Sequence, residues 1–467
     1  MPSLEIRMHR GVSEIGAEAW NALAGGDHPF VAHAFLAGLE EHGCIQPALG
    51  WQACPLGIYE DDRLIAAAPL YLKGNSHGEF VFDWSWASAY ARHGLDYYPK
   101  LLCAVPYTPV GGPRLLVGTG GDAPSLRRAL VEAIEQRTSA MGLSSAHLNF
   151  VDQEGADAFH GTRWLPRFDW QFHWRNQGWQ DFDEFLAALK PKKRKNIRQE
   201  RAQVDAAGIR CEIRHGDELE AGDWAVLHRL YLSTFDAHGN HPALTESFFR
   251  HLGRSVPRQV VAVLCRRRGR IIAAALCLRS ADTLYGRYWG ADETVPGLHF
   301  EACYYQGIDY CIRNGLRNFE PGAQGEHKIA RGFLPTRTRS FHRIVDPRFE
   351  TAIADALQRE GRALEGYREE LLGLSRSRGQ GGGRGGPPGP DSARSTLPSR
   401  QWKRRSRNPT ACSPLAATCA ASACSPRMQG AFSRGTRTAS RSSGGRRIRA
   451  WCSIPPPPMC RAGSSAG

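Results

Sequence analysis

The sequence lacks the short signatures that mark several large enzyme classes. It contains no Gly-x-Ser-x-Gly turn, no Walker loop and no His-Glu-x-x-His motif, which argues against serine hydrolases, P-loop nucleotidases and zinc proteases. No Cys-x-x-Cys pair or other zinc-like spacing occurs among the eight cysteines before residue 375, so we expect no metal. Cys265 and Cys277 lie in apolar runs, which predicts buried, reduced thiols.

Long apolar runs are also missing. The run Ile271–Leu278 has eight residues, far fewer than the roughly 20 that span a bilayer. The first 20 residues carry acidic side chains and have no apolar core of the kind found in signal peptides. These features predict a cytoplasmic protein without a membrane span.

Acidic residues are nearly absent from the last part of the chain. Of 60 lysines and arginines, 17 follow residue 374, against one acid, Asp391, which leaves 43 basic and 45 acidic residues in 1–374. The formal net charge of +14 therefore belongs to the tail. The nearly neutral remainder gives no reason to expect a stable nucleic-acid partner.

The tail, residues 375–467, is also poor in large apolar side chains. It has nine Leu, Ile, Met, Phe and Trp residues and no Val or Tyr, which is too few to offset the entropy lost on ordering. We expect it to be disordered. One interpretation is a basic arm that binds RNA, DNA or acidic lipid; the other, favoured by five scattered cysteines, is an extension read outside the native frame.

The chain before residue 375 contains an internal repeat. RLIAAAPLYL (63–72) resembles RIIAAALCLR (270–279), and each follows an apolar run and a short charged turn, a pattern that predicts a buried β-hairpin. Further along the chain, positions 203 residues apart also correspond: Trp86 with Trp289, and 94–98 with 297–301. A third pair of similar segments is 147–151 and 317–321, each of which follows a predicted helix.

Each half is thus predicted to run strand, helical region, hairpin, third strand, loop, helix, strand. This order predicts an α/β fold of mixed sheets flanked by helices. We expect an N-terminal half at residues 1–175, a C-terminal half at 176–374, and the tail at 375–467.

Several segments resemble one known family. They are GEFVFDWSWASAY (78–90), YYPKLLCAVPYTPVGGPRLL (97–116), KKRKNIRQER (192–201), YLSTFDAHGNHPALTESFF (231–249), LHFEACYYQGIDYCI (298–312) and FEPGAQGEHKIARGFLPT (319–336). They resemble the bacterial FemAB-like N-acyltransferases, described as peptidoglycan biosynthesis or recognition proteins. The resemblance covers roughly residues 10–370 and implies two GNAT-like (acyl-CoA N-acyltransferase) domains in tandem.

The segment 319–336 is the first candidate for chemistry. Gly322 and Gly325 bracket a turn, after which Glu326 and His327 are candidate bases, and the substrate-binding candidates are Lys328 and Arg331. A solvated loop is the alternative. His299 and Glu301, at a predicted helix start, could likewise act as base or substrate anchor, or serve only as helix-terminal residues.

A second group of candidates concerns the acyl donor. GNAT enzymes usually carry a glycine-rich pyrophosphate loop between the third strand and the next helix, but here Asp292 and Glu293 stand in ADETVPGLHFE. Acyl-CoA as cosubstrate therefore competes with an aminoacyl-tRNA. A basic helix is predicted to bind the donor phosphates, unless it is only a solvated surface; its residues are Lys192, Lys193, Arg194, Lys195 and Arg198.

Two further groups are substrate-binding candidates. Trp84 and Trp86 alternate with Phe82, which predicts a strand whose aromatic face lines a pocket or packs in the core. His241 lies in a Gly-Asn-His-Pro turn between predicted helices, and His238 directly precedes this turn. We expect both to contact substrate rather than a metal.

Together these features predict an N-acyltransferase that acts on an amine of an amino acid, peptide or amino sugar, in a cleft between the halves. Two alternatives stay open: a Fem-type aminoacyl-tRNA-dependent peptidyl ligase, and a non-catalytic binder of peptidoglycan precursors.

Overall fold

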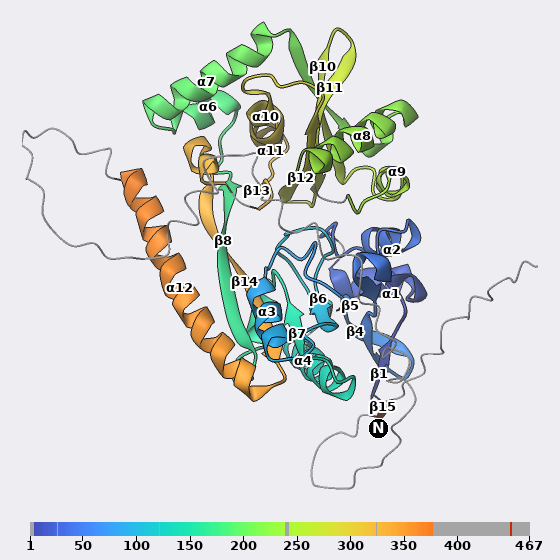
Figure 1. The fold of residues 1–467 in the computed structure, drawn as a ribbon. Helices are drawn as coiled ribbons and strands as arrows, with labels where there is room; N and C mark the ends of the chain where they lie inside the picture. The colour runs from blue at the N-terminus through green and yellow to red at the C-terminus, as the bar shows by residue number, and fades with distance from the viewer. Residues whose placement is uncertain are drawn as a thin grey trace, which may run out of the picture.

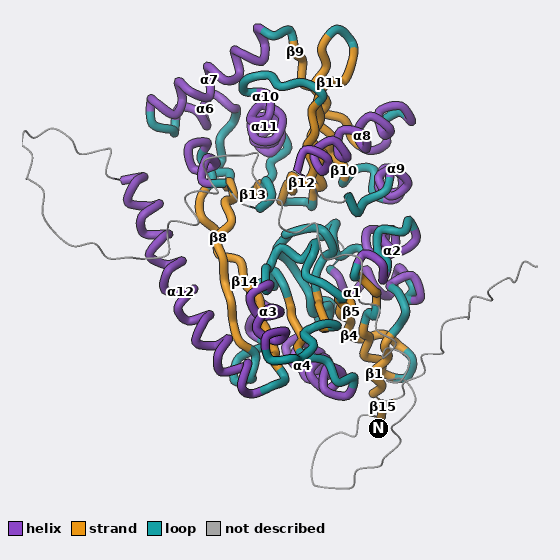
Figure 2. Tube along the Cα trace, in the orientation of Figure 1, coloured by secondary structure: helices purple, strands orange, loops and turns teal. Residues whose placement is uncertain are grey.

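Helices surround two β-sheets, one of 11 strands and one of four, as Figures 1 and 2 show. The computed structural model describes residues 4–25, 27–120, 122–238, 242–323, 325–376 and 449–450. The predicted α/β fold of mixed sheets is confirmed. Most of the predicted disordered tail lies outside the described residues.

The N-terminal half, residues 4–175, supplies eight strands and five α-helices to the described fold. In chain order these are β1 (Leu4–Met8), α1 (Ala17–Ala24), α2 (His33–Glu41), β2 (Trp51–Ala53), β3 (Leu56–Glu60), β4 (Arg63–Ala68), β5 (Leu70–Lys73), α3 (Trp84–Arg92), β6 (Lys100–Cys103), α4 (Ala123–Ala140), β7 (Ser145–Leu148), α5 (Gln153–Asp157) and β8 (Leu165–Arg175).

The C-terminal half, residues 176–376, continues the chain. Its elements are α6 (Phe182–Ala187), α7 (Pro191–Ala206), β9 (Ile209–His215), α8 (Ala221–His238), α9 (Glu246–Ser255), β10 (Val260–Arg267), β11 (Arg270–Arg279), β12 (Thr283–Ala291), α10 (Leu298–Phe300), the π-helical turn η4 (Glu301–Tyr305), α11 (Gln306–Arg313), β13 (Asn318–Glu320), the 3-10 helix η5 (Glu326–Arg331), β14 (Leu334–Ile344) and α12 (Pro347–Arg376). A short strand, β15 (Arg449–Ala450), pairs with β1.

The predicted hairpins are confirmed in both halves. β3 pairs antiparallel with β4, and β10 with β11, each through a two-residue loop. All four loop residues have positive φ, with Asp61 at 47° and Asp62 at 63° in the first, and Arg268 at 51° and Gly269 at 80° in the second. Such turns match the right-handed twist of the paired strands, which explains why short polar turns close both hairpins.

The repeat extends through the sheet and ends in an exchange of strands. After its hairpin each half adds a parallel pair joined through a helix, β6–β7 in the first half and β12–β13 in the second. The strand that follows each pair then joins the other half: β8 pairs with β13, and β14 pairs with β7. β8 and β14 also pair with each other along most of their length, so one sheet runs through both halves.

This exchange sets the direction of the parallel pairs. β8 runs from the N-terminal half into the C-terminal half, and β14 runs the opposite way. Because β13 is antiparallel to β8 and β7 is antiparallel to β14, both parallel pairs point their carboxyl ends toward the boundary between the halves.

The halves are also joined by a shared hydrophobic core. One cluster of buried residues combines α1 and α2 with α8, α9 and strands β10–β12. Within it the rings of Phe35 and Phe248 meet edge to face at 5.4 Å, and burying each such ring contributes about 1.5–3 kcal/mol. The long helix α12 lies along β8 and β14 (Figure 1).

The segment around Trp84 differs from the prediction. Trp84–Arg92 forms helix α3 rather than a strand, with Trp86 and Tyr90 buried on one face. The run WASAYA favours a helix because its apolar residues recur at a spacing of four. The pairing of Trp86 with Trp289 at an offset of 203 is therefore wrong, since Trp86 lies on helix α3 and Trp289 on strand β12.

No helix among the described residues has the length and apolar character required to cross a bilayer.

Candidate functional site

Polar side chains gather where the two parallel strand pairs separate. The last paired positions are Cys103 with Leu148 in the first half and Tyr285 with Glu320 in the second. The carboxyl ends of parallel strands at such a divergence are common ligand-binding positions in α/β proteins. We call the polar residues between these ends the junction site; they are His28, Thr108, Arg114, Asn149, Gln171, His173, Arg287, Tyr288, Glu320 and Lys328.

Arg287 and Glu320 occupy the divergence of β12 and β13. The Arg287 side chain is 3% exposed, and its Nη1 donates to the carbonyl oxygens of Gly286 at 2.7 Å and Glu320 at 3.2 Å. Its Nε and Nη2, and Oε2 of Glu320, are buried without a hydrogen-bond partner among the described residues. Nη2 lies 3.7 Å from Oε2, which is beyond hydrogen-bond distance.

The surroundings adjust the protonation of both groups. Burial raises the pKa of Glu320 to about 7, although Arg287 and Arg114 act in the opposite direction. Burial also lowers the pKa of Arg287, which keeps its charge at neutral pH because arginine starts so high. A carboxyl group with a pKa near neutrality is suited to accept a proton from a substrate.

His173 connects Glu320 to the N-terminal half. Its Nδ1 lies 3.7 Å from Glu320 Oε1 and its Nε2 lies 3.0 Å from Gln171 Oε1. Gln171 in turn donates from Nε2 to the carbonyl oxygen of Pro109 at 2.9 Å. Burial, followed by the charges of Arg287 and Lys328, lowers the pKa of His173 to about 3, so the ring is neutral.

The N-terminal half contributes Arg114 and Asn149. The Arg114 guanidinium donates to the carbonyl oxygens of Asn149 at 3.0 Å, Pro113 at 3.1 Å and Val110 at 2.5 Å, and so holds the loop after β6 against the end of β7. The Asn149 side-chain amide is buried with neither atom paired, and the same holds for the hydroxyls of Thr108 and Tyr288. Buried polar atoms without partners are rare in native proteins and mark places where a ligand or water binds.

Lys328 is a predicted substrate-binding residue that the structure brings to the junction site. It is 2% exposed, and its Nζ donates to the carbonyl oxygens of Gly322 at 2.8 Å and Ala323 at 3.2 Å. Burial, then the charge of Arg287, lowers its pKa to about 7. Gly322 and Gly325 have φ of 88° and 117°, backbone conformations that favour glycine.

His299, His327 and Arg331 lie together around η4. Nε2 of His327 is 2.9 Å from the Tyr304 hydroxyl, and the exposed ring of His299 meets Tyr304 edge to face at 5.5 Å. Partial burial of the His327 ring, then the charges of Lys328 and Arg331, lowers its pKa. Arg331 donates from Nη2 to Glu200 Oε1 at 2.7 Å and stacks on Phe300, so it ties η5 to α7.

The two carboxylates among the catalytic candidates have protein partners. Glu301 is 4% exposed and accepts from Arg201 Nε at 3.1 Å and Gln306 Nε2 at 2.7 Å. Glu326 is exposed and accepts from the Tyr367 hydroxyl at 2.6 Å. Their catalytic roles stay predictions.

The basic segment forms the start of α7, which begins at Pro191 as predicted. Lys192, Lys195 and Arg198 are exposed, whereas Lys193 and Arg194 are partly buried. Lys193 donates to the carbonyl oxygen of Ile329 at 3.0 Å. The predicted phosphate-binding helix therefore packs beside η5, next to His327 and Lys328.

The remaining substrate-binding candidates are not brought to the junction site. Trp84 is 43% exposed and Trp86 is 6% exposed on α3, where Trp86 contacts the ring of His342 at 5.0 Å. His238 ends α8, but its side chain is not among those described, and His241 lies outside the described residues.

Sequence reasoning did not single out Arg287, His173 or Asn149, and Arg114 and Glu320 appeared only inside quoted segments. A weak signal was present for two of them. Arg287 interrupts the apolar strand TLYGRYWGA, and Glu320 ends a short strand directly before Pro321 and Gly322, both of which are unusual positions for a charge in a buried sheet.

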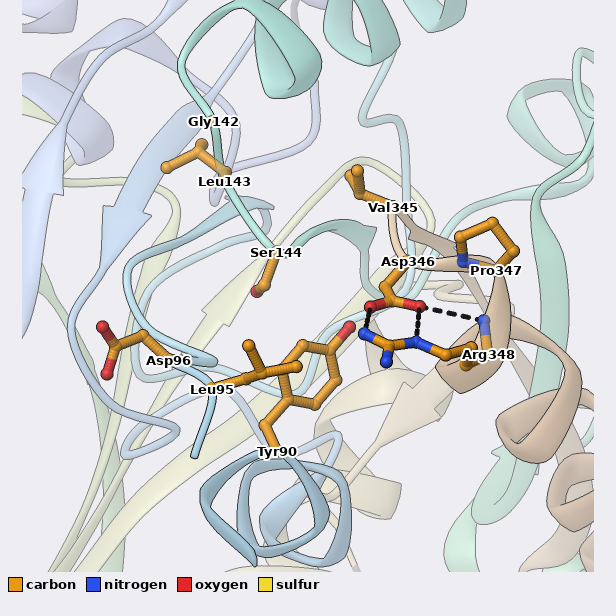
Figure 3. Close-up of a pocket in the computed structure, with 10 residues that line it drawn as sticks. All are labelled: Tyr90, Leu95, Asp96, Gly142, Leu143, Ser144, Val345, Asp346, Pro347 and Arg348. Atoms are coloured by element: carbon orange, nitrogen blue, oxygen red, sulfur yellow. Dashed lines mark hydrogen bonds and ion pairs between the residues drawn. The ribbon is translucent and has the colours of Figure 1, made fainter. Parts of the chain in front are cut away.

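The surface of the described residues includes the following two pockets. One, of about 530 Å³, is lined by Tyr90, Leu95, Ser144, Val345 and Arg348 among others (Figure 3), and so lies at the amino end of β7, opposite the junction site. The other, of about 300 Å³, lies between Asp27 of the first half and a group of second-half residues that includes His215, Arg258 and Ser280.

One group of described side chains has the types and spacing of metal ligands: Glu41, His42 and His251. It lies on α2 and α9, apart from the junction site.

Several solved structures resemble this chain. The C-terminal domain of a putative lysylphosphatidylglycerol synthetase from Agrobacterium fabrum is 12% identical with a TM-score of 0.45, covering 73% of this chain and 95% of that chain. FemX is 11% identical with a TM-score of 0.44, covering 75% and 100%. A tandem GNAT protein from the clavulanic acid biosynthesis pathway is 12% identical with a TM-score of 0.40, covering 74% and 99%.

No curated protein matches the chain. The profile of the FemAB-like family, described as peptidoglycan biosynthesis/recognition, matches residues 11–375. This match covers most of the chain, and the chain therefore belongs to the FemAB-like family.

Proposed function

We propose that this protein is a GNAT-type N-acyltransferase and that the junction site is its catalytic centre. One observation carries the proposal: Glu320, a buried carboxyl group with an oxygen that accepts no hydrogen bond and a pKa raised to about 7, stands where two parallel strands part. A group with these properties can take a proton from an amine near neutral pH.

The reaction proceeds by direct transfer. The ionised Glu320 accepts a proton from the acceptor's ammonium group, and the free amine attacks the acyl carbonyl carbon. A carbon–nitrogen bond forms, the carbon–sulfur bond of a thioester donor breaks, and the leaving thiolate takes the proton from Glu320. Glu320 then accepts the second proton that the new amide nitrogen loses and releases it to solvent. The cation of Lys328 stabilises the oxyanion that forms between these steps.

Acyl-CoA is the proposed donor. β12 has no strand partner on its β13 side beyond Tyr285 among the described residues, so its backbone can pair with an extended chain that carries amides, as the pantetheine arm does. An aminoacyl-tRNA is the alternative donor, favoured by the exposed cations Lys192, Lys195 and Arg198 beside η5.

Two observations support a proposal for the acceptor and for the cellular compartment. The family description supports an acceptor connected with peptidoglycan metabolism. The described cysteines are buried or partly buried, which fits the reduced thiols of a compartment such as the bacterial cytoplasm.

The test measures acyl transfer with Glu320→Gln beside a matched surface variant, Glu154→Gln. The first should lower kcat/KM by about 100-fold or more, since general bases contribute 10²–10⁴-fold, and the second should not change it. A wild-type rate in folded Glu320→Gln would overturn the proposal. A rise in melting temperature with acyl-CoAs or with charged tRNA identifies the donor. No change with either ligand favours the non-catalytic binder.

A further inference from the structure

We infer that the acceptor held at the junction site is a free α-amino acid, with its carboxylate on Arg287 and its ammonium group on Glu320. This inference rests on the proposed function, and it narrows the acceptor from amines in general to one chemical class.

The unpaired atoms of Arg287 form one half of the argument. Nη1 is used by the carbonyl oxygens of Gly286 and Glu320, whereas Nε and Nη2 are both buried without a hydrogen bond, and Nη2 makes only a 3.7 Å ion pair with Glu320 Oε2. These two nitrogens form the edge of a guanidinium that binds a carboxylate through two parallel hydrogen bonds. A buried cation with this edge empty is a costly arrangement unless a ligand completes it.

Glu320 supplies the other half. Its Oε2 is a buried acceptor without a donor, and it lies 3.7 Å from Nη2 of Arg287. The site therefore presents two free donors and one free acceptor side by side. The matching ligand carries an anionic group with two oxygens next to a cationic donor, which is the arrangement of a carboxylate and an ammonium group on one carbon.

Other ligands fit these atoms less well. A phosphate or sulfate would fill the Arg287 edge but would face the Glu320 carboxylate. An amino sugar or a simple amine would satisfy Glu320 but leave the Arg287 edge empty. A peptide longer than one residue separates its amine from its carboxylate, so both groups cannot reach two side chains this close.

The local charge supports the same ligand. Arg287 and Arg114 face Glu320 and lower its pKa, and Asp282 raises it, while His173 and His28 have lowered pKa values and are neutral. A zwitterion adds no net charge to this buried region. Its carboxylate supplies hydrogen bonds to the Arg287 guanidinium, to which the side chain of Glu320 makes none. The unpaired amide of Asn149 and hydroxyl of Tyr288 remain for the amino acid's own side chain.

The experiment measures binding to the full chain without an acyl donor. The twenty proteinogenic L-amino acids are added one at a time, and melting temperature and calorimetric Kd are recorded. For any amino acid that binds, its amide lacks the carboxylate and its N-acetyl derivative lacks the ammonium group. We expect each derivative to bind roughly 100-fold more weakly or not at all, because a site built for a polar group rejects analogues that lack it.

Variants test the two contacts separately. Arg287→Lys keeps the charge but removes the fork, and should weaken binding of the amino acid about tenfold or more without changing the weak binding of its amide. Glu320→Gln should remove the preference for the free ammonium group. Arg313→Gln, an exposed arginine on α11, serves as the matched control and should bind as the wild type does.

The outcomes separate this inference from the proposed function. If no amino acid binds, or if the amide binds as tightly as the acid, the inference is overturned, even where acyl transfer to other amines is observed. If an amino acid binds with the expected discrimination but no donor is consumed, the inference stands and the transferase proposal fails. The ligand series uses the wild-type chain, so it decides the matter even where a variant fails to fold.

Discussion

Nδ1 of His147 lies 2.7 Å from Nδ1 of His342, and this contact joins β7 to β14 across the strand exchange. Because one nitrogen must donate and the other accept, at least one of the two rings is neutral in the fold. Their outer nitrogens lie 2.9 Å from the hydroxyls of Ser145 and Ser340. Burial lowers the pKa of His147 to about 3 and that of His342 well below its usual value.

This pair predicts that stability falls in mild acid. Both pKa values are lower in the folded state than the ordinary 6.5, so the stabilisation is complete above pH 6.5 and is lost as the pH falls, by up to about 1.4 kcal/mol per pH unit for each histidine. The groups facing the pair are Asp83, Lys100 and Arg167. Urea unfolding at pH 7.5 and 5.5 should show a smaller loss for His342→Asn than for the wild type. Exposed His160→Asn is the control, and equal losses in all three proteins would contradict the assignment.

The rate should depend on pH through Glu320. Since Glu320 must be ionised and Lys328 must be protonated, and both pKa values are about 7, kcat/KM should rise about tenfold per pH unit below 7 and fall again above it. Steady-state rates between pH 5.5 and 8.5 measure this rise. The residual activity of Glu320→Gln should lack it, and an unchanged profile in that variant would assign the titration to another group.

The side chains of Glu326 and His327 on η5 should contribute to turnover but not to the stability of the fold. The double variant Glu326→Ala, His327→Ala removes exposed side chains whose partners are the hydroxyls of Tyr367 and Tyr304. We expect at least a tenfold lower kcat, with the same circular dichroism spectrum and a similar melting temperature. Wild-type turnover in the folded double variant would remove η5 from the site.

The exposed cations of α7 should act on the donor alone. Replacing Lys192, Lys195 and Arg198 by Gln should raise KM for a phosphate-bearing donor several-fold and weaken its dependence on salt, with kcat unchanged. Lys193 is left in place because it bonds to Ile329. The matched control replaces three exposed arginines on α11 and α12, Arg313, Arg359 and Arg362. Equal effects in both triple variants would show that general charge, not this helix, is responsible.

Local signals in the sequence predicted much of the secondary structure. The charged turns at 61–62 and 268–269 identified both hairpins, and Pro191 with buried Ile197 and Val204 located α7. The Trp84 segment misled because alternating aromatics over five residues fit a short strand as well as a helix. The exchange of β8 and β14 leaves no periodic signal, since a strand's pattern records which face is buried and not which neighbour it pairs with.

The candidate site was predicted in part for a similar reason. Lys328, His327 and His299 could be chosen because each stands within a dense polar segment. Arg287, Glu320 and Asn149 are single polar residues on or beside strands far apart in sequence, and only the directions of β7 and β13 bring them together.

The crossing of the final strands also shapes how the molecule is made. The edge of β7, complete at Leu148, receives its neighbour only when Leu334–Ile344 is synthesised. At ordinary rates of translation this takes roughly 10–40 s. During that time the nascent N-terminal half has an unpaired β7 edge that can aggregate. Chaperones and proteases therefore have their main opportunity to act on it before β14 of the C-terminal half pairs with this edge.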